Sequence, residues 1–316
     1  MTTNIPAGYV TRRPRADDAP RIHELISLCD VQVIGKADMT LDDVADQFGD
    51  PSFDPKTDGW LVHDATGRVA AWAWAWRKGT SGNVDVDVVA HPAVPELTGP
   101  LWDTVTGRAR EIAAGLGHER AVVDIALYRE DGGKRAVAAA RGFTAATTFI
   151  RLRADHTGSI RHPALPAGVT VHDGLTDEVR RQGHAVEQAG FAEHFGFAPK
   201  GYDEWYDELA SSASTDWSQL AVARLDGEPA AMLLGTDAFL GDENCGYVRR
   251  LAVLPAFRGR GLGRFMLRGA FTRDAGRGRA GTYLHVDANN GTPALDLYLS
   301  VGMRQVLAID VWRRTI

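Results

Sequence analysis

The sequence is poor in cysteine and has no long apolar run. Its 316 residues include two cysteines, Cys29 and Cys245, which lie far apart and lack the spacing of metal ligands. A disulfide framework and a zinc site are therefore not expected. No apolar stretch reaches the roughly 18 residues that a membrane span requires. Residues 1–8 lack the basic and apolar regions of a signal peptide. We expect a cytoplasmic protein that binds no metal and no membrane.

An excess of positive charge is also missing. The chain has 41 acidic and 35 basic residues, which give a net charge of -6, and this argues against general binding of nucleic acid. A hydrophobic fraction of 44% with 24% charged residues is typical of a globular protein. The length exceeds that of a usual single domain, so we expect two. The sequence does not decide between a monomer and a homodimer.

A segment rich in glycine and arginine lies between a strand pattern at Tyr247–Val253 and a helix pattern at Gly261–Ala275. Glycines let the backbone approach a ligand closely, and the first free amides of a helix bind anions. No Lys-Ser or Lys-Thr follows, as a nucleotide-hydrolase loop requires, and Arg264 stands where a dinucleotide fingerprint has its third glycine. The pattern predicts a diphosphate site of another kind.

The segment Arg258–Gly263 resembles the R-x-x-G-x-G pyrophosphate loop of the GCN5-related N-acetyltransferase (GNAT) family. A second resemblance follows at residues 290–303, where an Asn precedes a helix that carries Ala, Leu and Tyr and ends at a glycine. Met303 replaces the usual Phe. The resemblance implies that acetyl-CoA, or another acyl-CoA, is the cofactor.

The resemblance also assigns residues to that cofactor. The backbone of Leu251, Ala252 and Val253 would bind the pantetheine and the thioester oxygen, in the manner of an oxyanion hole. The diphosphate would be bound by the loop residues Arg258, Gly259, Arg260, Gly261, Leu262, Gly263 and Arg264. Asn290 would either hydrogen-bond the cofactor or cap the following helix.

Candidate catalytic groups are less well defined. Tyr298 is the candidate general acid, since a phenol is protonated at neutral pH, although an aromatic residue on an amphipathic helix also fits a core position. Glu243 and His285 are candidate general bases. Further candidates for that role are Asp287, Glu193 and His194. Arg249 and Arg250 stand where many members of the family have an acidic residue.

The chain repeats one order of elements. Residues 155–168 are predicted to be a linker, and the segments on either side, 1–154 and 169–316, follow the same pattern of strands and helices. We expect an α/β fold, a mixed sheet flanked by helices, in two tandem GNAT-like domains, as in the mycothiol synthase-like group. Prolines replace the glycine loop at 91–100, so the N-terminal domain is expected to be degenerate, structural and part of the acceptor cleft.

The resemblance implies an acyltransferase that moves an acetyl or other short acyl group from CoA to a small-molecule acceptor, a primary amine. Direct attack in a ternary complex is expected, because no Cys or Ser with a paired base is evident. One alternative is a non-catalytic acyl-CoA-binding or regulatory protein. Another is an enzyme with a second CoA site at 91–100. The sequence does not identify the acceptor or the length of the acyl group.

Overall fold

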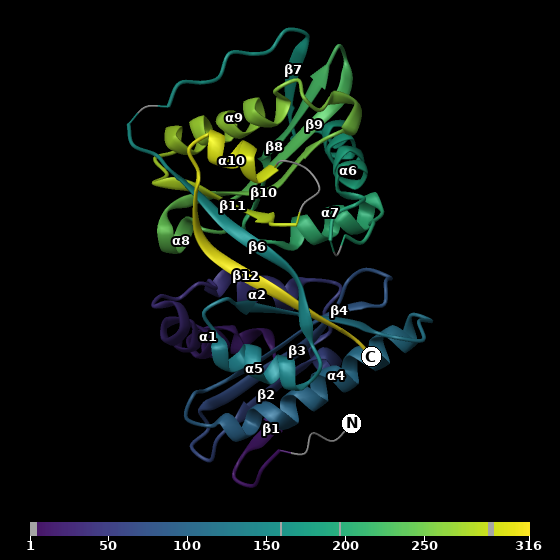
Figure 1. Ribbon diagram of the computed structural model, residues 1–316, viewed down its shortest axis with the longest axis vertical. Helices are drawn as coiled ribbons and strands as arrows, with labels where there is room; N and C mark the ends of the chain where they lie inside the picture. The colour runs from purple at the N-terminus through teal and green to yellow at the C-terminus, as the bar shows by residue number, and fades with distance from the viewer. Residues whose placement is uncertain (1–4, 159, 196, 290–293) are drawn as a thin grey trace. The chain divides into compact units, whose positions relative to one another are not determined.

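The computed structural model describes residues 5–158, 160–195, 197–289 and 294–316. These residues form two compact units (Figure 1). Unit 1 contains the chain up to residue 147 together with residues 309–316, and unit 2 contains residues 148–308. The predicted α/β class, with a mixed sheet flanked by helices, is confirmed.

Unit 1 has a mixed sheet in the order β1-β2-β3-β4-β5-β12, in which only β4 and β5 are parallel. Its strands are β1 (Val10–Arg12), β2 (Gly59–His63), β3 (Val69–Arg77), β4 (Asn83–Ala90), β5 (Val122–Tyr128) and the end of β12 (Arg304–Thr315). Its helices are η1 (Ala16–Asp18), α1 (Ala19–Ile34), α2 (Leu41–Gly49), α3 (Pro55–Asp58), η2 (Pro95–Leu97), α4 (Thr98–Gly115) and α5 (Gly132–Ala140).

Two apolar clusters cover the faces of this sheet. The larger one joins α4 to the strands through Leu101, Trp102 and Val105, and the other joins α1 and α2 to β3. The alternation at 72–76 predicts three indoles on one face of a strand. Trp72 is fully buried in the second cluster, and Trp74 and Trp76 pack against it. The tryptophan stripe is therefore part of the core of unit 1.

Unit 2 has the sheet order β6-β11-β10-β9-β8-β7. Its strands are β6 (Thr144–Asp155), β7 (Val169–Asp173), β8 (Thr215–Leu225), β9 (Glu228–Thr236), β10 (Cys245–Val253) and β11 (Gly281–Asp287). Its helices are α6 (Asp177–Phe191), α7 (Tyr202–Ser211), α8 (Leu240–Glu243), η3 (Pro255–Phe257), α9 (Leu262–Gly276) and α10 (Ala294–Ser300). One apolar cluster joins α9 and α10 to the sheet, and another joins α6 and α7 to its opposite face.

Each unit is completed by a strand from the other half of the sequence. Residues 149–155 of β6 pair with β11, from Phe149↔Asp287 to Asp155↔Gly281. Residues 309–315 of β12 pair with β5, from Ile309↔Tyr128 to Thr315↔Val122. The compact units therefore differ from the expected domains 1–154 and 169–316. The local pattern identifies both segments as strands, but the choice of partner is made by tertiary packing, which the pattern does not encode.

One parallel strand pair in each unit separates after a few residues. In unit 2, β10 and β11 pair from Cys245↔Gly281 to Val248↔Leu284. Beyond that point β10 continues to Val253 alongside β9, and β11 continues to Asp287 alongside β6. We call this divergence the β10–β11 opening. The pair β4 and β5 separates in the same way after Asp85↔Asp124.

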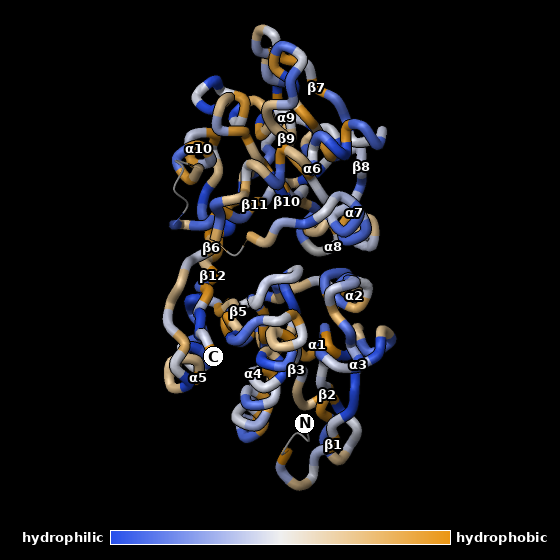
Figure 2. The backbone as a smooth tube through the Cα atoms, turned by 90° about the vertical axis from the view of Figure 1, so that its right-hand side faces the viewer, coloured by the Kyte–Doolittle hydropathy of each residue, from blue (hydrophilic) through white to orange (hydrophobic). Residues whose placement is uncertain are grey.

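The apolar stretches of the chain are short. Figure 2 shows hydrophobic and hydrophilic segments alternating along the backbone of both units. In the part of the chain that the structure describes, no helix is both long enough and apolar enough to cross a membrane.

Candidate acyl-CoA site

The glycine-rich segment forms the turn between η3 and the N-terminus of α9. Gly259 and Gly261 both have φ +76°, a left-handed conformation that side chains disfavour. The first intrahelical bond of α9 runs from the Phe265 N–H to the Gly261 carbonyl at 3.0 Å. The amides of residues 262–264 therefore precede the hydrogen-bonded ladder. This end of α9 has the free donors and the dipole that favour an anion.

Arginine side chains surround this turn. Arg258, Arg260 and Arg264 are all exposed. Arg258 Nε donates to the Val253 carbonyl at 3.2 Å, and Arg264 Nη2 donates to Ser300 Oγ on α10 at 2.9 Å. The Arg260 guanidinium lies 5.9 Å from the centre of the Phe257 ring. The charges lie beside the helix N-terminus, where they add to its attraction for a phosphate group.

Gly263 fixes how closely α9 approaches α10. A Cβ atom at this position would lie 3.2 Å from Leu297 Cδ2 and 3.6 Å from Val253 Cγ2. The glycine therefore permits the turn, the end of β10 and α10 to pack together.

The β10–β11 opening leads directly to this turn. Residues 251–253 pair with β9, from Leu251↔Leu233 to Val253↔Ala231, and lie past the last pair with β11. The backbone edge that would face β11 is available to an extended ligand, which can pair as an added strand. A chain with amide groups that ends in a diphosphate matches this sequence of an open strand edge followed by a helix N-terminus. The described residues therefore fit an acyl-CoA.

Tyr298 lies on α10 within the cluster that joins α9 and α10 to the sheet. It is 8% exposed, and burial raises its pKa to about 12. Its hydroxyl is therefore protonated at neutral pH and can act as a hydrogen-bond donor. Asn290, the other candidate of the second motif, lies outside the described residues.

The two candidate bases lie in different places. Glu243 precedes β10, with its Oε2 3.0 Å from Arg153 Nη1 and in a hydrogen bond with the Tyr283 hydroxyl. The glycine turn follows the other end of this nine-residue strand, about 25–30 Å away at 3.3 Å per residue. The structure therefore does not bring Glu243 to the proposed cofactor loop.

His285 is the first residue of β11 beyond the last pair with β10. Its Nε2 accepts a hydrogen bond from Arg151 Nε at 2.8 Å. The lone pair on Nε2 requires the ring proton to be on Nδ1, which lies 2.9 Å from the Tyr247 hydroxyl. These contacts engage both ring nitrogens of His285 at the opening.

Residues 193 and 194 lie in the turn after α6. The His194 ring packs 4.6 Å from the Phe191 ring, and burial lowers its pKa. Glu193 is exposed, and Asp287 is the last residue of β11. These contacts do not favour any one of Glu193, His194 and Asp287 over the others as the general base.

Arg249 and Arg250 both point to the side of the sheet that α6 and α7 cover. A register shift between Val248 and Arg250 interrupts the alternation of side chains along β10. Arg249 Nη2 lies 3.4 Å from Glu208 Oε1 on α7, and Arg250 Nε lies 3.4 Å from Glu187 Oε1 on α6. These carboxylates were not among the site residues predicted from the sequence. Glu187 could have been noticed, because it is an acidic residue beside the apolar positions of α6.

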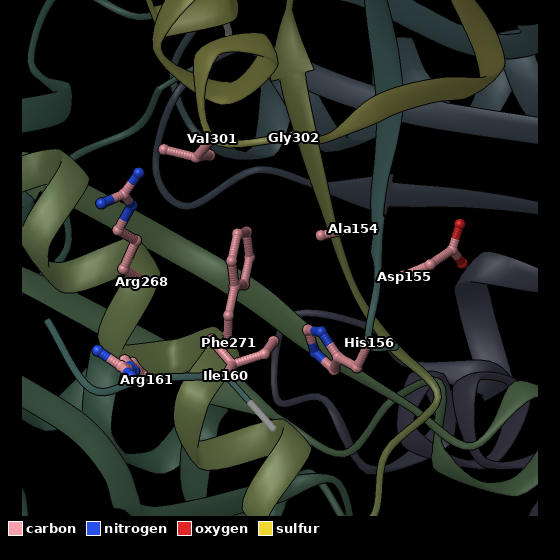
Figure 3. A pocket seen from close by; sticks show the side chains of 9 residues that line it. All are labelled: Ala154, Asp155, His156, Ile160, Arg161, Arg268, Phe271, Val301 and Gly302. Atoms are coloured by element: carbon pink, nitrogen blue, oxygen red, sulfur yellow. The ribbon is translucent and has the colours of Figure 1, made fainter. Parts of the chain in front are cut away.

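A cavity of about 350 Å³ in unit 2 lies away from this site. Figure 3 shows Arg161 and Arg268 on one side of Phe271, with Asp155 and His156 on the other. Phe271 is nine residues after Leu262, and therefore about 14 Å along α9 from its N-terminus. The cavity is lined by none of the predicted site residues.

A comparison with models of known protein families shows what unit 2 is similar to. Residues 184–303 match the model of the acetyltransferase (GNAT) family. Most of unit 2 is therefore similar to a GNAT domain. The matched range includes the glycine turn, the β10–β11 opening and Tyr298, so the features described above lie within the family's own region.

Individual proteins resemble this chain over different lengths. A mycothiol acetyltransferase from Renibacterium salmoninarum is 27% identical over 169 residues, which are 51% of this chain and 48% of that protein. The match therefore spans about half the length of that relative. The structure of a GCN5-related N-acetyltransferase from Sphaerobacter thermophilus has a TM-score of 0.80 at 20% identity and covers 99% of this chain and 97% of that one.

A tandem GNAT protein from the clavulanic acid biosynthesis pathway has a TM-score of 0.69 at 18% identity, with 97% of this chain and 98% of that one covered. At these identities the two structures show a shared fold. They cover both halves of this chain, which confirms the expected tandem arrangement of the fold.

Proposed function

We propose that this protein is a CoA-dependent acyltransferase that moves an acetyl or other short acyl group to the amine of a small molecule. The observation that carries this proposal is the continuity between the open edge of β10 and the glycine turn at the N-terminus of α9. The family of unit 2 supports acyl transfer from CoA. The proposals for the acceptor and for the order of the chemical steps are supported by the residues of this chain rather than by its relatives.

Acyl-CoA would supply an activated thioester. The amides of residues 262–264 and the neighbouring arginines would bind its diphosphate, and the open edge of β10 would hold its extended arm. In the transfer, the amine nitrogen bonds to the acyl carbon as the carbon–sulfur bond breaks. Tyr298 holds a proton on its hydroxyl for the departing sulfur. Of the two candidate bases, His285 lies at the opening, and its Nε2 would take the proton that the amine loses once it is released from Arg151 Nε.

Direct transfer to the amine agrees with the state of the two cysteines. Cys245 is buried, and burial raises the pKa of its thiol. Burial raises the pKa of Cys29 to about 11, and this residue lies in unit 1. A thiol with a raised pKa is a poor nucleophile at neutral pH. An acylated cysteine is therefore not part of the proposed route.

The alternative is a protein that binds acyl-CoA without turnover. It is favoured by Arg249 and Arg250, because guanidinium groups next to the opening do not accept a proton. Release of free CoA in the presence of amines distinguishes the two functions.

The affinity for acetyl-CoA tests the proposed site. A Gly261→Asp variant should bind acetyl-CoA at least about tenfold more weakly, because a carboxylate at the helix N-terminus repels the diphosphate. Isothermal titration calorimetry measures the affinity and the number of sites. Gly261→Asn is the matched control, since Asn has the same shape, tolerates a positive φ and is neutral. It should bind within a few-fold of the wild type.

Equal binding by the wild type and the Asp variant would overturn the proposed site. Two sites per chain in the wild type would instead support the alternative in which the first half binds a second CoA.

The raised pKa of Tyr298 leads to a second prediction, which concerns how kcat changes at alkaline pH. A phenol normally titrates near pH 10.0, and burial moves this group to about 12. The raised pKa keeps the hydroxyl protonated as the pH rises through 9 and 10, so Tyr298 should cause no loss of kcat in that range. The measurement is kcat against pH at saturating acetyl-CoA. An alkaline decline below pH 10 that disappears in Tyr298→Phe would contradict this assignment.

A further inference from the structure

Two arginines stand side by side where the β10–β11 opening begins. Arg249 follows Val248, the last residue of β10 that pairs with β11. Neighbouring residues in a regular strand point to opposite faces. The bulge after Val248 instead directs both Arg249 and Arg250 toward α6 and α7. Bulges of this kind re-aim side chains next to active sites.

The carboxylates near these arginines are shared with other donors. Glu208 also forms an ion pair with Lys200, and Glu187 accepts a hydrogen bond from Trp205 Nε1 at 3.0 Å. Burial alone would raise the pKa of Glu208, but the charges of Lys200 and Arg249 lower it. Lys200 and the two arginines carry three positive charges, and Glu187 and Glu208 carry two negative ones. The cluster therefore has one positive charge in excess.

The two guanidinium groups also have more N–H donors than the hydrogen bonds that they form with the described residues. A guanidinium has five N–H groups. Among the described residues, the partners of Arg249 are limited to Glu208 at 3.4 Å, and those of Arg250 to Glu187 at 3.4 Å and the Arg249 carbonyl at 3.0 Å. Both ion pairs are long contacts rather than two-pronged ones. Burial and the charge of Arg250 lower the pKa of Arg249, yet its side chain is 24% exposed and that of Arg250 is 37% exposed.

We propose that Arg249 and Arg250 bind a carboxylate of the acceptor, which is therefore an amino acid or a similar amine with one carboxylate. This inference rests on the proposed function and specifies its substrate class. A single carboxylate neutralises the excess charge, and its two oxygens match the paired donors of a guanidinium. A phosphate dianion would leave an uncompensated negative charge in the cluster.

The location also suits the reaction. A carboxylate bound by Arg249 lies beside the last paired residue of β10, and an amino acid holds its amine a few bonds away. One or two strand residues cover about 3–7 Å. The amine of such an acceptor would therefore reach the opening, where His285 and the open edge of β10 lie.

The test compares acids with amides. The standard L-amino acids, β-alanine and 4-aminobutyrate are each assayed against their carboxamides with acetyl-CoA, by release of free CoA. Binding of each compound to the protein loaded with CoA is measured by calorimetry at fixed ionic strength. We expect at least one acid to be preferred over its amide by about tenfold or more in kcat/KM and in affinity, since hydrogen bonds between charged groups are the strong ones.

Variants of the arginines complete the test. Arg249→Gln and Arg250→Gln should remove the preference for the acid while leaving acetyl-CoA affinity unchanged. Arg250→Lys keeps the charge and should retain part of the preference. The matched control is Arg224→Gln, because Arg224 Nη2 also pairs with an α6 carboxylate, Glu178, at 2.6 Å but lies on β8. The control should keep the full preference.

Several outcomes would overturn the proposal. The first is that acids and their amides are used equally well. The second is that no acid is turned over and none binds. The third is that the Gln variants keep the preference for the acid. A preference for succinyl-CoA over acetyl-CoA that the same variants abolish would assign the arginines to the donor's acyl group instead. Failure of acetyl-CoA to bind the wild type would overturn the proposed function, and binding of the acids to the free protein would still test the arginine pair.

Discussion

A Tyr298→Phe variant is expected to transfer the acetyl group about 10²- to 10⁴-fold more slowly than the wild type, the usual range for loss of a general acid. The ring of Tyr298 packs in the core between α9, α10 and the sheet. Phe keeps that packing and removes only the hydroxyl. The variant should therefore bind acetyl-CoA and unfold at nearly the same temperature as the wild type. The measurement is kcat at saturating acetyl-CoA and acceptor.

Tyr202→Phe is the control for this change. It removes a hydroxyl in the same unit that donates to Asp177 at 2.6 Å on the surface, and it should alter kcat by no more than a few-fold. If Tyr298→Phe turns over as fast as the wild type, Tyr298 is a core residue and the proton for the sulfur has another source.

Deletion of residues 309–316 is expected to prevent unit 1 from folding. These residues form the strand that pairs with β5, and they include Val311, which is buried. They also supply Arg313, which makes two bonds to the buried Asp124 at 2.7 and 2.8 Å. Loss of one partner of a buried ion pair costs about 3–5 kcal/mol, a large part of the 5–15 kcal/mol that a typical domain has. Circular dichroism during thermal unfolding measures the effect.

Point substitutions separate the ion pair from the strand. Arg313→Met should lower the free energy of unfolding by about 3 kcal/mol or more. Arg314→Met is the matched control, because Arg314 has no carboxylate partner among the described residues, and surface substitutions of this kind change stability by about 0.5 kcal/mol or less. A truncated protein with the unfolding transition of the intact chain would show that the β12 pairing does not stabilise unit 1.

Local signals made much of unit 2 predictable. The alternation and β-branched residues at 247–253 predict a strand that the structure shows at Cys245–Val253. The helix predicted at 261–275 occurs at Leu262–Gly276, and the left-handed glycines lie where the turn requires them. These features depend on neighbours in the sequence. A similar signal was available for α2, whose Thr40 and Asp43 form a capping box that the sequence analysis did not use.

Features that depend on distant residues could not be predicted in this way. A strand pattern at 304–313 is equally compatible with a partner in either unit, because the period of two fixes faces and not neighbours. The bulge that places Arg249 and Arg250 on one face depends on β9. Glu243 precedes β10, five residues before the opening at Val248 and so about 15 Å from it. This makes Glu243 the less suitable of the two bases chosen from the sequence.

The exchange of strands has a consequence for the protein while it is being made. Tyr128 pairs with Ile309. The edge of β5 therefore stays unpaired until a segment 181 residues later in the chain has been synthesised. At about 5–20 residues per second, the ribosome takes roughly 10–40 s to reach that segment. During this interval the nascent chain presents an unpaired strand edge, a surface prone to aggregation. Chaperones that bind β5 before translation reaches residue 309 would therefore raise the yield of folded protein.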